Sequence, residues 1–131
     1  MNDVLNYLKE CGVFYLATNE GDQPRVRPFG AVAEFEGKLY LVTNNQKKVY
    51  QQMLKNPKVE ISGMDRGTWI RITAEVVPDS RREARVKMLE DNRESLGSMY
   101  QADDGRMEVL YLKNAVATIE SFTDEPKTIR F

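Results

Sequence analysis

Short runs of alternating apolar and polar residues, separated by turns, occupy most of this sequence. Strand-like runs lie at residues 13–18, 25–35, 38–43, 58–64, 68–77, 107–112 and 115–122. Alternation with a period of two is typical of strands, and no strand–helix–strand rhythm connects these runs. The pattern therefore predicts a mainly β fold with peripheral helices, in which about seven antiparallel strands surround a small barrel.

Helical spacing interrupts the strands at four places. The expected helices span about residues 2–12, 47–56, 80–92 and 93–100. Asn2 or Asp3 would cap the first and Ser80 the third, because their side-chain oxygens can accept hydrogen bonds from free helix N–H groups. Residues 124–131 have no helical or strand signal. A single domain, residues 1–131, is expected because a second core would not fit in this length.

Two residue counts exclude several kinds of chemistry. The chain has no histidine, which removes serine–histidine and cysteine–histidine nucleophiles, histidine-ligated haem and most zinc sites. Cys11 is the only cysteine, so neither an internal disulfide nor a CxxC redox centre can form. No metal site is expected. Either the chain only binds a ligand, or a cofactor brings the reactivity.

Neither a membrane span nor a secretory leader is expected. The longest apolar runs have four or five residues, whereas a membrane helix needs roughly 20. No basic, apolar and small-residue leader opens the chain, so the expected location is the cytoplasm.

Positive charge is concentrated in one part of a chain whose net charge is −1. Residues 23–59 carry seven basic side chains and only two acidic ones. A nucleic-acid backbone would need a wider basic footprint, so this local excess favours a small anion as ligand. A small barrel that binds single-stranded nucleic acid is an alternative, based on the basic strand with Phe29, Phe35 and Tyr40.

Two adjacent lysines stand at the start of the helix expected over 47–56. Positive charge near a helix N-terminus is disfavoured, typically by ~0.3–1 kcal/mol, because the helix dipole is positive there. A phosphate would remove this conflict, held by helix N–H groups, by Lys47 and Lys48 and by the hydroxyl of Thr43. The alternative is that both ammonium groups only reach solvent.

Residues 25–30 combine two arginines with an aromatic ring. Arg25, Arg27 and Phe29 share one face of the expected strand. Pro28 cannot donate to a β ladder and Gly30 leaves the backbone bare, which suits an edge that a ligand can approach closely. A planar aromatic ligand with a phosphate tail fits this mixture. The alternative is an edge strand that charge and proline protect from aggregation.

The strand expected over 68–77 places Trp69 and Arg71 on one face, with Thr73 and Glu75. An aromatic ring beside an arginine suits a subunit interface or the edge of a ligand. The alternative is a tryptophan that covers the mouth of the barrel.

These segments, in this order and spacing, resemble the pyridoxamine 5′-phosphate oxidase-like superfamily of FMN-binding split barrels. The resemblance covers residues 13–122 and is closest to the small branch that includes nitroimidazole-resistance and general-stress proteins. The stretches that carry it are Arg27-Pro28-Phe29-Gly30, Leu41-Val42-Thr43-Asn44, Lys47-Lys48 and Asn56-Pro57 before Lys58-Val59-Glu60-Ile61. Each stretch alone is unspecific, but the ordered set is specific.

The resemblance implies an FMN site with a phosphate end and a ring end. Lys47 and Lys48 would bind the phosphate, and Thr43 with Asn44 would line the phosphate and ribityl end. Residues 27–30 would run beside the isoalloxazine ring. The complete set of expected cofactor-binding residues is Arg25, Arg27, Pro28, Phe29, Gly30, Val42, Thr43, Asn44, Lys47, Lys48, Trp69 and Arg71.

The resemblance also implies a homodimer with FMN at the subunit interface. Trp69 falls near a position at which the oxidase has a glutamine that the second subunit supplies. Arg71 or Arg27 could stabilise negative charge on the reduced ring. No acid–base residue can be named, so the catalytic residues remain unassigned.

The expected function is that of an FMN-binding flavoprotein, a small oxidoreductase that passes electrons from a reduced nicotinamide or a protein donor to a small acceptor. Oxidation of pyridoxamine 5′-phosphate is not expected, because the C-terminal substrate motif of the oxidase includes a histidine. This chain has no histidine and stops at Arg130-Phe131. The alternative is a non-catalytic stress or storage protein that binds a flavin or a deazaflavin.

Overall fold

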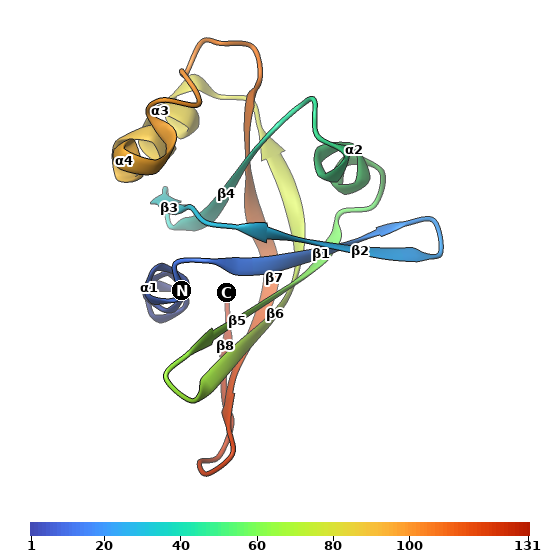
Figure 1. The fold of residues 1–131 in the computed structure, drawn as a ribbon, viewed down its shortest axis with the longest axis vertical. Coiled ribbons are helices and arrows are strands. Elements are labelled where there is room, and N and C mark those ends of the chain that lie inside the picture. Colours follow the sequence, from blue (N-terminus) through green and yellow to red (C-terminus); the bar gives the residue numbers. More distant parts are fainter.

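The chain folds into one curled antiparallel sheet with helices against it (Figure 1). The computed structural model describes residues 1–131. In chain order the elements are α1 (Asn2–Cys11), β1 (Phe14–Glu20), β2 (Gln23–Phe29), β3 (Val32–Phe35), β4 (Lys38–Asn44), α2 (Lys48–Lys55), β5 (Lys58–Asp65), β6 (Thr68–Asp79), α3 (Arg82–Asp91), α4 (Arg93–Leu96), β7 (Met107–Ser121) and β8 (Lys127–Arg130). The mainly β, antiparallel architecture predicted from the alternating runs is confirmed.

The order of strands explains how the sheet closes. It runs β2-β1-β5-β6-β7-β4-β3, and β8 pairs with β7 outside this path. The two edge strands, β2 and β3, follow each other directly in the chain, so Gly30 and Ala31 carry the backbone from one edge of the sheet to the other. The prediction of one strand over residues 25–35 was therefore wrong. Its two halves pair with different neighbours, Phe29 opposite Phe14 on β1 and Val32 opposite Leu41 on β4.

The C-terminal strands differ from the prediction in the opposite way. The two runs at 107–112 and 115–122 form one strand, β7, which passes a register shift between Thr73 and Glu75 of β6. Asn114 takes up the irregularity with a φ of 52° and donates a 3.0 Å hydrogen bond to Glu75. Residues 127–130, predicted to lack regular structure, form β8 because the C-terminal half of β7 has an unpaired edge. Just beyond β8, Ala115 and Phe131 exchange backbone hydrogen bonds.

The helices are close to the predicted positions, but their ends are not. The fourth stops at Leu96, four residues before the predicted end, and Gly97 begins an irregular segment. Met1 and Arg81 occupy the N-cap positions of α1 and α3, and no side chain caps either helix. The predicted capping by Asn2, Asp3 and Ser80 was therefore wrong. None of the four helices is both long and apolar enough to cross a lipid bilayer.

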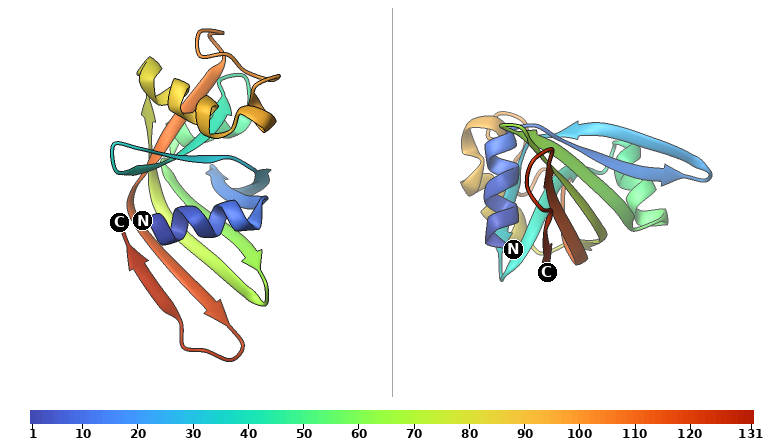
Figure 2. Two further views of the ribbon diagram at one scale, coloured as in Figure 1. Left: turned by 90° about the vertical axis from the view of Figure 1, so that its left-hand side faces the viewer. Right: turned by 90° about the horizontal axis from the view of Figure 1, so that it is seen from below.

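Strand β4 separates two hydrophobic cores. Leu39 and Leu41 face the barrel core, which α1 and α2 help to cover. Tyr40 and Val42 face a second core formed with α3 and α4. Figure 2 shows α3 and α4 gathered at the end of the molecule opposite the β7–β8 hairpin. The alternation predicted for this strand is present, but both of its faces are buried.

Candidate functional site

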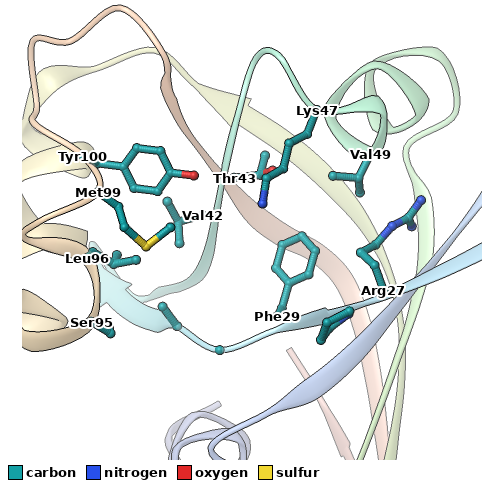
Figure 3. Close-up of a pocket in the computed structure, with 13 residues that line it drawn as sticks. Arg27, Phe29, Val42, Thr43, Lys47, Val49, Ser95, Leu96, Met99 and Tyr100 are labelled. Carbon is teal, nitrogen blue, oxygen red and sulfur yellow. The ribbon is translucent and has the colours of Figure 1, made fainter.

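A pocket of about 270 Å³ opens beside the Gly30–Ala31 junction, where the two edges of the sheet meet (Figure 3). Its walls come from the end of β2, from β4 and the start of α2, and from the segment around α4. The lining residues are Arg27, Pro28, Phe29, Gly30, Ala31, Val42, Thr43, Lys47, Val49, Ser95, Leu96, Met99 and Tyr100. The fold thus brings together seven of the twelve residues that the sequence predicted for the flavin site.

One side of the pocket is polar and contains an unpartnered hydroxyl. The side chain of Thr43 is buried, and its Oγ1 has no hydrogen-bond partner in the protein. The ammonium group of Lys47 points into the pocket beside Thr43 (Figure 3). Lys47 forms no ion pair. Because a buried hydroxyl normally has a partner, this pair is suited to an anionic ligand atom.

Arg27 lies at another edge of the pocket, and hydrogen bonds to residues outside the pocket fix its side chain. Its guanidinium donates to Oγ1 of Thr18 at 2.8 Å and to Oε1 of Gln52 at 2.6 Å. Both acceptors are neutral, and Arg27 forms no ion pair with a carboxylate. Partial burial, followed by the nearby charge of Arg25, lowers the pKa of Arg27, although a guanidinium stays charged near neutral pH. Its positive charge is therefore available to a ligand.

The remaining wall is apolar. Phe29, Val42 and Leu96 are buried and line the pocket from three different elements, β2, β4 and α4. The side chain of Met99 lies over the pocket between Leu96 and Val42 (Figure 3). Such a wall can hold a flat apolar ring, while the polar side holds a charged group.

Asn44 lies behind the pocket wall and is engaged by the protein itself. Its Oδ1 accepts a 3.0 Å hydrogen bond from the backbone N–H of Gln46, and its Nδ2 donates at 2.9 Å to the hydroxyl of Tyr100. The side chain predicted to line the phosphate and ribityl end therefore contacts Tyr100, which lines the pocket in its place.

Arg25 and Lys48 are near the pocket but outside it. Arg25 is paired with Glu20 at 2.9 Å in the β1–β2 hairpin. Lys48, the first residue of α2, faces a separate polar hollow that includes Glu20, Gln51 and Lys55. The two adjacent lysines of the sequence thus point to different places.

Trp69 and Arg71 lie on β6, near the tip of the β5–β6 hairpin and outside the pocket. The indole Nε1 of Trp69 donates to Glu120 at 2.8 Å, and its ring centroid is 5.1 Å from that of Phe122. Arg71 is paired with Glu60 at 2.9 Å. Within one chain, neither residue contributes to the pocket.

Six lining residues were not predicted as part of the site. Ala31 and Val49 adjoin predicted residues, Gly30 and Lys48. Ser95, Leu96, Met99 and Tyr100 come from the segment around α4, which the packing of α3 and α4 against the sheet brings to the pocket. No local pattern indicates them, because the Asn44–Tyr100 contact spans 56 residues of chain.

Comparison with known proteins agrees with this fold and pocket. The family model described as pyridoxamine 5′-phosphate oxidase matches residues 2–122, nearly the whole chain. The chain belongs to the pyridoxamine 5′-phosphate oxidase family. The predicted resemblance is thereby confirmed, and the family match also includes α1. No curated protein gave a match to the chain.

Several solved structures are similar to this family member. A NimC/NimA family protein from Clostridium acetobutylicum is 58% identical, with a TM-score of 0.96, over 100% of this chain and 92% of that one. A protein from the same organism related to general stress protein 26 of Bacillus subtilis has 16% identity and a TM-score of 0.73, over 96% and 91% of the two chains. A FAD-binding protein from Mesorhizobium loti has 15% identity and a TM-score of 0.65, over 92% and 94%. The two distant structures support the split-barrel fold alone.

Proposed function

We propose that the pocket beside the Gly30–Ala31 junction binds FMN and that the protein is a small flavin oxidoreductase. The observation that carries this proposal is the buried, unpartnered hydroxyl of Thr43 beside the ammonium group of Lys47, which forms no ion pair, with the guanidinium of Arg27 at another edge of the same pocket. A phosphate oxygen would accept a hydrogen bond from Thr43 and interact with both cations. The family membership supports a flavin as the ligand.

The residues of this chain would hold the two ends of FMN in different surroundings. Thr43, Lys47 and Arg27 would fix the phosphate, and the apolar wall of Phe29 and Val42 would cover the ring and exclude water from it. When bound, FMN supplies the redox chemistry, accepting electrons from a reduced nicotinamide or a protein donor and passing them to a small acceptor. The protein itself would contribute by binding FMN, orienting it and setting the electrostatic surroundings of its ring and phosphate.

We also propose that the protein is a cytoplasmic homodimer in which the second copy completes the site. Phe122 is 93% exposed and Met64 is 72% exposed, and both lie beside Trp69 at the hairpin tips. An exposed apolar cluster of this kind marks an interface. Trp69 and Arg71 could reach a bound ring only from a second copy, because they lie outside the pocket of their own chain.

Oxidation of pyridoxamine 5′-phosphate is not part of this proposal. That substrate would need a phosphate clamp of its own, in addition to the one used for FMN. The pocket holds one set of phosphate-binding groups, Thr43 and Lys47 with Arg27 at another edge, and the chain has no histidine to orient the substrate.

The test begins with the visible spectrum and the mass of whatever copurifies with the protein. FMN should copurify, or bind on addition with quenching of its fluorescence, and NADH or NADPH should reduce it reversibly when a small acceptor is supplied. Tight FMN binding without turnover would identify the non-catalytic flavin or deazaflavin protein instead. Absence of FMN binding would overturn the proposal entirely.

Two further measurements test the finer statements. Light scattering should give a dimer at micromolar concentration, and a monomer with full FMN occupancy would contradict the shared site. Incubation of the FMN-loaded protein with pyridoxamine 5′-phosphate and oxygen should give no aldehyde at an enzymatic rate, on the order of 1 per second.

A further inference from the structure

The hydrogen-bond directions around Asn44 are fixed by chemistry. The backbone N–H of Gln46 can only donate, so the Asn44 atom that it contacts at 3.0 Å must be the oxygen Oδ1. The other end of the amide, Nδ2, must then face the hydroxyl of Tyr100 at 2.9 Å. An amide nitrogen can only donate as well. The oxygen of Tyr100 is therefore the acceptor in this contact.

This arrangement leaves the hydroxyl proton of Tyr100 without a hydrogen-bond acceptor in the protein. The phenol oxygen accepts from Asn44, and no protein atom accepts from its O–H group. Tyr100 is buried, its side chain is part of the pocket wall, and its hydroxyl points toward Thr43 and Lys47 (Figure 3). Two buried hydroxyls, those of Thr43 and Tyr100, thus have an unused hydrogen-bonding capacity on the same side of the pocket.

We propose that the hydroxyl of Tyr100 donates a hydrogen bond to the phosphate of the bound flavin, and that Asn44 is the residue that positions it. This inference rests on the proposed FMN site. Lys47 supplies the positive charge, and two neutral hydroxyl donors come from different segments of the chain, Thr43 from β4 and Tyr100 from the segment after α4. Because Asn44 occupies one lone pair of the phenol oxygen, the O–H group is directed away from Asn44 and into the pocket.

The decisive variant is Tyr100→Phe, which removes the hydroxyl and keeps the ring. The dissociation constants of FMN and of riboflavin, which lacks the phosphate, are measured by fluorescence quenching for the wild type and the variant. We expect the FMN constant to rise roughly 10- to 100-fold, since hydrogen bonds to charged groups have that effect. The riboflavin constant should not change. Tyr111→Phe is the matched control, because Tyr111 lies on β7 outside the pocket, and it should leave both constants unchanged.

The outcomes separate this inference from the proposed function. A wild type that binds no FMN overturns the proposed function. If the wild type binds FMN and Tyr100→Phe has the same FMN dissociation constant, only the role of Tyr100 is overturned. Equal weakening of FMN and riboflavin would show that Tyr100 acts on the ring or the ribityl chain, and would overturn its assignment to the phosphate.

The role of Asn44 is tested by a double-mutant cycle on FMN affinity. Asn44→Ala should weaken FMN binding in the wild type and should add little in the Tyr100→Phe background, because Asn44 acts through Tyr100. Additive effects would overturn the positioning role. Thermal unfolding of each variant without FMN verifies that the variant is folded. If Asn44→Ala does not fold, the comparison of Tyr100→Phe with the wild type still tests the role of Tyr100.

Discussion

The guanidinium of Arg27 donates a 2.6 Å hydrogen bond to the side-chain oxygen of Gln52, which lies on α2. Thr18 of β1 donates to the same oxygen. Gln52 is only 7% exposed although it is polar, whereas Leu54, two residues later, is 49% exposed. Gln52 thus connects β1, β2 and α2 behind the pocket.

Gln52→Leu should therefore destabilise the protein although it adds an apolar side chain to a buried position. Thr18 and Arg27 would lose their acceptor, and an unsatisfied buried donor costs about 1–3 kcal/mol. Urea unfolding gives the difference in free energy. Gln51→Leu, on the exposed side of the same helix turn, is the control and should change stability by less than about 0.5 kcal/mol. Equal stability of the two variants would contradict the bridging role.

The two adjacent lysines should differ in their effect on FMN binding. Lys47 lines the pocket and Lys48 does not, so Lys47→Ala should raise the FMN dissociation constant about 10-fold or more. Lys48→Ala changes the net charge equally and serves as the matched control, with an effect below about threefold. A larger loss in Lys48→Ala would place the phosphate in the polar hollow beside α2.

Gly30→Ala should separate stability from ligand binding. A Cβ at Gly30 would meet only the carbonyl oxygen of Gly12 at 3.6 Å, an ordinary contact, and the φ of Gly30 is not positive. The unfolding free energy should stay unchanged or rise by about 0.4–1 kcal/mol. FMN affinity should fall if the bound ring approaches this backbone closely, because the added methyl group would then meet the ring. Unchanged affinity would show that the ligand does not touch this backbone.

Acid should destabilise the protein in part through Asp79. Hydrogen bonds from Arg81 lower the pKa of Asp79 from 3.8 to about 2. Desolvation opposes this shift, and the hydroxyl of Tyr40, which donates to Asp79 at 2.7 Å, adds to it. Because the pKa of Asp79 is lower in the folded than in the unfolded protein, its carboxylate contributes fully to the free energy of unfolding above pH ~4. This contribution is lost as the pH falls through about 2. It amounts to about 2 kcal/mol.

Asp79→Asn should remove this part of the pH dependence, as measured by urea unfolding between pH ~4 and 2. Asp22→Asn, in the exposed turn between β1 and β2, is the control and should keep the wild-type profile. An Asp79→Asn profile parallel to that of the wild type would show that the carboxylate contributes nothing to acid stability.

The fold was predictable wherever burial alternates along one strand. Strand β6 shows this clearly, because its buried Ile70 and Ile72 alternate with the exposed Arg71. The break after Phe29 was missed, because Pro28 and Gly30 indicated an irregular edge but only the closing of the sheet separates the two halves. Strand β8 has no signal of its own because its pairing is set by the free edge of β7.

The candidate site was predictable where its residues are close in sequence. Residues 27–30 and the Val42–Thr43 pair formed local patterns, and the fold brings them together. Tyr100 could not be predicted, because the packing of α3 and α4 places it beside Asn44. The burial of Gln52 was equally hidden, since its partners Thr18 and Arg27 belong to other elements.

Strand β4 has a consequence for how the molecule opens. Because both of its faces are buried, its amide hydrogens can exchange with solvent only when both cores separate, and they should be among the slowest to exchange. The short α4 packs against the second core through Leu96 and can open locally. A ligand in the pocket would touch Val42 of the second core and Val49 of the barrel core together. Occupancy should therefore slow exchange in α4 more than in β4, and make the two cores unfold as one unit.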